Sequence, residues 1–78
     1  MGRQSSLSEE TLKHTQGMDR FQIIWYLTGE IERMIRLQQF YFKLKTYAEE
    51  HDQMKVWMLG MSDAMAEETI LRAELESL

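Results

Sequence analysis

Residues 37–65 read LQQFYFKLKTYAEEHDQMKVWMLGMSDAM, and this stretch decides the fold. Apolar residues recur in it at alternating spacings of three and four, the heptad pattern of a helix with coiled-coil-like packing. Its second half is methionine, and its polar member is His51. We call the series the 37–65 seam; its members are Leu37, Phe40, Leu44, Tyr47, His51, Met54, Met58, Met61 and Met65.

A second apolar stripe precedes the seam and overlaps with its first half. At about 100° per residue, the two stripes fall on nearly opposite sides of one helix, so residues 37–48 are apolar almost all round. This pattern is typical of a helix that is sandwiched between two neighbours. Only the seam continues after residue 48, which favours a reversal of the chain there. The second stripe consists of Ile24, Leu27, Ile31, Met34, Ile35 and Phe42.

These patterns predict an all-α fold: one small helical domain over 1–78, with a short N-terminal helix followed by a long helical hairpin. The first long helix is expected over 19–50, opened by a capping box of Asp19 and Gln22. A turn near 50–53 would place Asp52 as the N-cap of a second helix over 53–77. Two alternatives stay open. One is a bent long helix with a break at 60–62, and the other is a single continuous helix. If the turn lies at 50–53, the seam is expected to fold back on itself as the core of the hairpin.

The N-terminal region predicts a weaker element. Residues 1–5 look like a flexible tail, and a short helix is expected over 7–16. Either Ser6, in a capping box, or Ser8 would be its N-cap, and Gly17 would end it. Leu7 and Leu12 give this helix little to bury, so we expect weak docking.

Size and charge define the class of protein. The chain has 78 residues, 44% of them hydrophobic, and no cysteine. A chain of this size buries too little surface to be robust alone, so association with another chain is the expected support. Residues 1–48 carry a net charge of +2 and residues 49–78 carry −6, which favours an antiparallel arrangement with the halves facing each other. No transmembrane segment is predicted, and we expect a soluble protein in a reducing intracellular compartment.

Catalytic, metal and cofactor sites are not predicted. Ser62, His51 and Asp63 have the residue types of a triad, but Ser62 and Asp63 are neighbours that a helix cap explains. His51 has three interpretations: a histidine at the core edge or in the turn, bonded to backbone or water; a polar residue that sets register; and a pH switch.

A protein-binding role is the favoured interpretation, because methionines and aromatic residues supply adaptable contact surfaces. We expect a non-enzymatic helical module that forms part of a hetero-complex or, slightly less favoured, a homo-oligomer. The alternative is a small regulator or chaperone that masks another protein, with Glu67, Glu68, Glu74 and Glu76 steering its approach. A nucleic-acid-binding helix-turn-helix is a weaker alternative, since the basic residues do not share one face. The predicted partner-binding residues are Phe40, Leu44, Tyr47, Met54, Trp57, Met58, Met61 and Met65.

Overall fold

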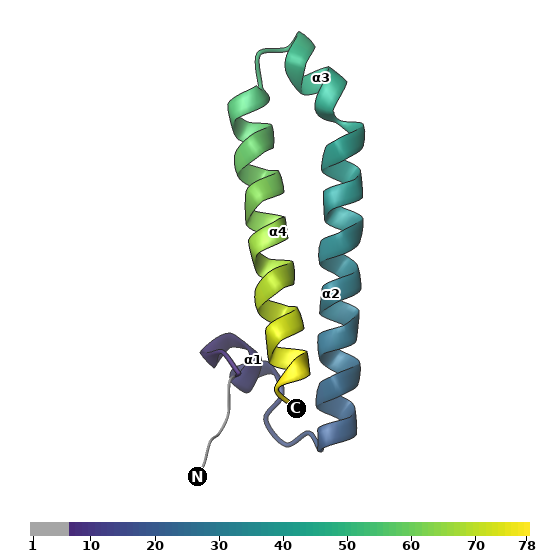
Figure 1. Cartoon of the computed structure of the whole chain (residues 1–78), viewed down its shortest axis with the longest axis vertical. Coiled ribbons are helices and arrows are strands. Elements are labelled where there is room, and N and C mark those ends of the chain that lie inside the picture. The colour runs from purple at the N-terminus through teal and green to yellow at the C-terminus, as the bar shows by residue number, and fades with distance from the viewer. Residues whose placement is uncertain (1–6) are drawn as a thin grey trace.

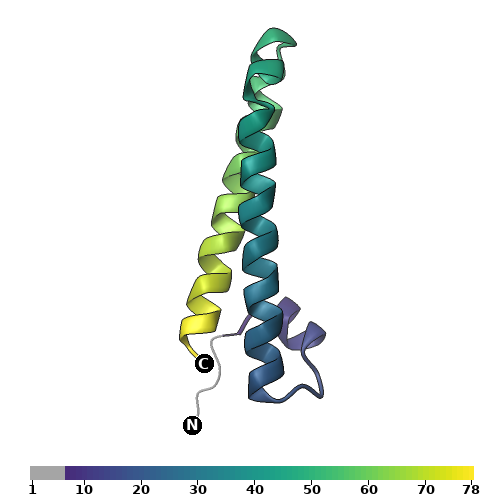
Figure 2. The same ribbon diagram turned by 90° about the vertical axis from the view of Figure 1, so that its right-hand side faces the viewer.

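Two long antiparallel helices form the body of the protein in a computed structural model that describes residues 7–78 (Figure 1). The tail expected over 1–5 lies outside the described residues. The helices are α1 (Glu9–His14), α2 (Arg20–Lys43), α3 (Lys45–Glu50) and α4 (Met54–Glu76). The predicted all-α hairpin is confirmed, because α2 and α4 pack side by side along their length (Figures 1 and 2).

The first half of the hairpin begins at a reciprocal cap and ends at a tightened turn. Asp19 accepts a hydrogen bond from the Gln22 amide at 2.8 Å, and the Gln22 side chain accepts one from the Asp19 amide at 2.9 Å. At the other end, the Leu44 amide is shared between the Phe40 and Tyr41 carbonyls. This three-centre bond tightens the helix. Beyond it, α3 leans across the closed end of the hairpin toward α4 (Figure 1).

The chain reverses in a Schellman motif that lacks glycine. His51 is the C-cap of α3, and Asp52 has a positive φ of 57°. The Gln53 amide donates to the Ala48 carbonyl at 2.7 Å, the six-to-one bond that defines the motif. The expectation that Asp52 is the N-cap of the second helix is wrong, because Gln53 holds that position and makes no side-chain cap bond.

Helix α4 continues without interruption through Gly60, so the break considered at 60–62 does not occur. Gly60 serves close packing instead. A Cβ added there would overlap with the Tyr41 ring on the facing helix. The Trp57 indole, one turn away, donates to the Tyr41 carbonyl and ties the two helices together near the turn.

A small hydrophobic core lies in the part of the hairpin far from the turn. Leu27, Ile31, Met34 and Leu71 are buried there, and Leu27 has no solvent exposure. The core therefore comes from the stripe that precedes the seam and from the last turns of α4. Half-buried side chains border it: Leu7, Ile23, Tyr26, Ile35, Leu75 and Leu78.

Polar bonds hold α1 on the hairpin, together with the packing of Leu7, which precedes the helix, against the core. Ser8 caps the helix by accepting from the Thr11 amide at 3.2 Å. Thr11 is buried, and its hydroxyl donates to the Glu74 carboxylate of α4 at 2.6 Å. The second Glu74 oxygen accepts from the Ser8 amide at 3.3 Å. The weak docking of this helix was expected from its few apolar residues alone. That reasoning missed the polar bonds to Glu74.

Candidate protein-binding surface

The seam lies largely in solvent, although the chain turns where it was expected to turn. Exposed fractions are 55% for Phe40, 57% for Tyr47, 57% for Met58 and 53% for Met65. Leu37 and Leu44 are each 36% exposed. The expectation that the seam forms the core of the hairpin is therefore wrong. The reason is that α2 and α4 contact each other through other sides of the two helices than those that carry the seam.

The two halves of the seam point to opposite sides of the hairpin. On α2, at about 100° per residue, Leu37 and Leu44 are rotated about 80–100° from buried Leu27 in one sense. On α4, the methionines at 58, 61 and 65 are rotated about 60–120° from buried Ala64 in the other sense. In an antiparallel pair, equal senses of rotation lead to the same side, so opposite senses lead to opposite sides.

Helix α1 identifies one of these sides. Tyr26, on the same stripe of α2 as Leu37, has its ring 6.0 Å from the His14 ring of α1. Glu74, rotated on α4 in the matching sense, bonds to Thr11 of α1. We call this side the α1 face. It is turned away from the viewer in Figure 1, and α1 stands to the right of α2 in Figure 2.

The other side is largely apolar near the turn, where the methionines lie, and carries the charged side chains of Arg72 and Glu76 farther from it; no element in residues 7–78 covers it. Its α4 half carries the methionines of the seam, and its α2 half carries residues rotated in the matching sense by about 60–80°. Phe42 is 68% exposed, while Ile24 and Ile35 are half-buried. We call this side the methionine face; it consists of Met54, Met58, Met61 and Met65 of α4 with Ile24, Ile35 and Phe42 of α2.

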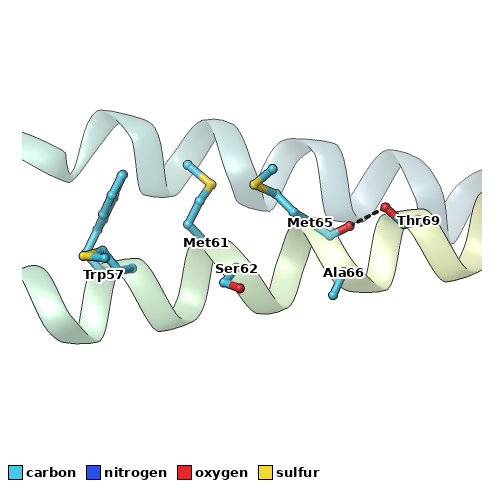
Figure 3. Close-up of a pocket in the computed structure, with 7 residues that line it drawn as sticks. Trp57, Met61, Ser62, Met65, Ala66 and Thr69 are labelled. Carbon is cyan, nitrogen blue, oxygen red and sulfur yellow. Dashed lines mark hydrogen bonds between the residues drawn. The ribbon is translucent and has the colours of Figure 1, made fainter.

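A shallow groove of about 460 Å³ follows α4 along the methionine face. In Figure 3 the side chains of Trp57, Met61 and Met65 extend to the same side of α4, while Ser62 and Ala66 point elsewhere. Trp57 is held in place by its bond to the Tyr41 carbonyl, so it gives the groove one rigid wall beside flexible thioethers. The residues that line it are Trp57, Met58, Met61, Ser62, Met65, Ala66 and Thr69.

The aromatic half of the predicted partner-binding set is placed elsewhere. Leu44 and Tyr47 line a separate hollow of about 170 Å³ at the closed end, where Trp57 and Val56 also contribute. Phe40 lines neither hollow. The structure therefore brings Trp57, Met58, Met61 and Met65 together along the groove, and Trp57 also meets Leu44 and Tyr47 in the second hollow. Met54, like Phe40, lines neither hollow.

Sequence reasoning missed the α2 half of the methionine face. Ile24, Ile35 and Phe42 were assigned to a stripe as a whole, and that stripe also contains the buried core residues. Helical periodicity alone places these three residues at one edge of that stripe. Their alignment beside the methionines depends on how α2 and α4 pack.

His51 lies in the turn, exposed, with its ring stacked on Tyr47 at 3.8 Å between centroids. Its Nδ1 is 2.9 Å from the Tyr47 carbonyl. These contacts favour the interpretation of His51 as a turn residue bonded to backbone. Ser62 lies within α4, and in the described part of the chain no three His, Asp or Glu side chains gather as metal ligands would.

Charge is distributed unevenly between the two long helices. By formal charge, α2 carries four basic and two acidic residues, for +2, and α4 carries two basic and five acidic residues, for −3. The ion pairs of residues 7–78 are nevertheless local, joining Glu10 with His14, Glu30 with Arg33, and Glu68 with Arg72. Complementary halves thus face each other without direct ion pairs between α2 and α4.

Three groups, Arg33, Glu68 and Tyr26, have shifted pKa values, and the hydrogen bond to Glu30 raises the pKa of Arg33. The Gln38 amide of α2 donates to the Glu68 carboxylate of α4 at 2.5 Å, and Arg72 donates at 2.7 Å. These two bonds lower the pKa of Glu68 below its ordinary value. Burial, and then the nearby carboxylate of Glu30, raise the pKa of Tyr26 on the α1 face.

The chain matches no family model, no curated protein and no solved structure. Among the described helices, none has the length and apolar character needed to cross a membrane.

Proposed function

We propose that this chain is a non-enzymatic protein-binding module that associates with another polypeptide through its methionine face. The observation that carries this proposal is the exposure of Met58, Met65 and Phe42 together on one uncovered side of a two-helix layer. Apolar groups gathered on one surface are typical of a contact site, whereas scattered ones need no explanation.

The architecture supports the same conclusion. A stable domain needs two packed layers, and a single pair of helices is one layer with two sides. The Cα radius of gyration is 15.5 Å, against about 11.5 Å for a compact domain of this length. A partner on the methionine face would supply the missing layer, as α1 does over part of the opposite side.

The chemistry of the face also fits a binding role. Methionine is unbranched and polarizable, so a row of methionines adapts to the shape of a partner. The fixed Trp57 ring beside this row resembles the rigid aromatic anchors that dominate interface energetics.

The regulator or chaperone alternative is favoured by this same adaptability, since flexible methionine surfaces accept more than one partner. Glu74 does not belong to the steering residues that this alternative requires. Glu74 is only 2% exposed and holds α1, so it is not free to steer an approaching partner. Glu67 and Glu76 are exposed and keep that role in the alternative.

A pair of double variants on α4 tests the proposal. Met58→Glu with Met65→Glu places two charges on the methionine face. Leu59→Glu with Ile70→Glu places two charges on a side of α4 turned away from it, by about 120–140° from Ala64 in the opposite sense. The pairs are matched, because the side chains are 57% and 53% exposed in the first and 58% and 49% in the second.

The readouts are molar mass by light scattering over a range of concentrations and the binding of an apolar fluorescent dye. We expect wild type to associate or, as a monomer, to bind the dye. The methionine pair should lose both properties, and the Leu59/Ile70 pair should keep them. A wild-type chain that is a folded monomer and binds no dye would contradict the proposal.

A further inference from the structure

The methionine face has the right size and chemistry to pack against the same face of a second copy. We infer that two chains associate in this way, with α2 of each chain against α4 of the other and both turns at the same end. The inference rests on the proposed protein-binding function, and it names the partner.

The available area fits such a dimer. Helix α4 has 23 residues, which correspond to about 35 Å of length at 1.5 Å per residue. Two helices side by side, each about 10 Å across, present a side of roughly 700 Å². Standard interfaces bury about 800 Å² per partner. One whole side of the hairpin therefore comes close to the area that a stable association normally buries.

Symmetry leaves two ways to stack these faces. A two-fold axis parallel to the helices places α2 of one chain over α4 of the other, with both turns at one end. A two-fold axis across the helices places α2 over α2 and α4 over α4, with the turns at opposite ends. Both arrangements give a four-helix bundle, and both bury the methionines.

Charge complementarity decides between the two arrangements. Helix α2 carries +2 and helix α4 carries −3, counted over the residues of each helix. In the first arrangement every α2 has only α4 helices as neighbours, so opposite charges adjoin throughout. In the second, the two α4 helices with −3 each lie against one another, which electrostatic complementarity disfavours. The arrangement with both turns at one end is therefore the one that the charges select.

A distance measurement between the two turns tests this arrangement. The chain has no cysteine, so Glu49→Cys, at an exposed site of α3, gives one unique position for a nitroxide label. Light scattering on the same sample should give twice the 9.3 kDa mass of one chain. Pulsed electron resonance should then give a label separation of about 20–30 Å, set by two adjacent helices and the label arms.

Each other outcome overturns a defined part of the inference. A dimer with labels about 45 Å or more apart has its turns at opposite ends, which rejects the arrangement. A dye-binding monomer rejects the second copy but leaves the protein-binding proposal intact, whereas a folded monomer without dye binding rejects both.

The matched α4 variants complete the test. Met58→Glu with Met65→Glu should weaken the dimer by roughly 100-fold or more in dissociation constant, because two charges enter the apolar interface. Leu59→Glu with Ile70→Glu should leave it within a few-fold. Because all four side chains are exposed in the single chain, circular dichroism should show a folded hairpin in both. Equal weakening by the two pairs would place the interface elsewhere.

Discussion

The two sides of the helical hairpin differ in what covers them. On the α1 face, a six-residue helix covers the end far from the turn, and its threonine at 11 bonds to buried Glu74. On the methionine face, four thioether side chains and Phe42 line an open surface. The difference shows that the chain covers part of one side by itself with directional polar bonds, while Leu37 and Leu44 stay exposed there. The other side is left with adaptable apolar groups that an additional chain can cover.

The largest expected effect concerns the core that both faces share. Leu27→Ala should reduce the free energy of unfolding by about 2–5 kcal/mol, because Leu27 is fully buried and the truncation leaves a cavity. Urea unfolding followed by circular dichroism measures this loss. The control is Leu12→Ala on α1, where the side chain is 45% exposed and a loss below about 0.5 kcal/mol is expected. Equal losses in the two variants would show that the core is not where we place it.

The next effect tests the α1 face alone. Glu74→Ala removes the acceptor of the Thr11 hydroxyl and the Ser8 amide, which should release α1 at a cost of about 1–3 kcal/mol. Hydrogen exchange of the α1 amides should become fast while the amides at the centre of α2 stay protected. Glu74→Gln keeps an acceptor and should lose less. Persistent protection of α1 in Glu74→Ala would mean that the polar anchor is not what holds it.

A pair of glycine substitutions compares a packed site with an open one. Gly60→Ala should destabilise by about 1–2 kcal/mol, because its Cβ would overlap with the Tyr41 ring across the hairpin. Gly29→Ala should stabilise by up to about 1 kcal/mol, since nothing lies within 4 Å of the added Cβ and alanine favours the helix. Thermal unfolding of both variants measures the difference. If both variants are more stable than wild type, the two helices do not approach closely at Gly60.

The smallest effect concerns the polar bridge between Gln38 and Glu68. Because these bonds hold the pKa of Glu68 below its ordinary value of 4.5, the folded chain binds this proton less readily than the unfolded chain. The stabilisation is present above the unfolded pKa and is lost as the pH falls through the folded pKa. Wild type should therefore be more stable than Glu68→Gln at pH 7, and this difference should be smaller at pH 3. Urea unfolding midpoints of both proteins at pH 7 and pH 3 measure this difference. A difference that grows on acidification would mean that folding raises the pKa of Glu68 and does not lower it.

Several features were readable from residues alone because their causes are local. The capping box of Asp19 and Gln22 is a matter of spacing, and it forms as expected. The apolar face at the end of the chain, with Ala64, Leu71 and Leu75, follows from helical periodicity and packs in the hairpin. The turn was recognised from the ending of one stripe, but its geometry was not. An aspartate occupies the positive-φ position where glycine is the usual signal.

The candidate surface was only half predictable. Periodicity shows that Leu37, Leu44, Met58 and Met65 belong to one series, and along a single straight helix they would share one side. Across a reversal, the geometry of the turn sets the rotation of α4 relative to α2 independently of the series. That rotation sends the aromatic half toward the α1 face and the methionine half to the open face.

The sequence by itself determined the helical class, the caps and the apolar side of each helix, because these depend on neighbours within about four residues. Only the tertiary structure decided what those sides meet. Burial of Leu27 against Leu71 left the 37–65 seam outside the core, and the bond from Thr11 to Glu74 anchored α1 on one face. Both results depend on contacts between residues far apart in the chain, which no local pattern specifies.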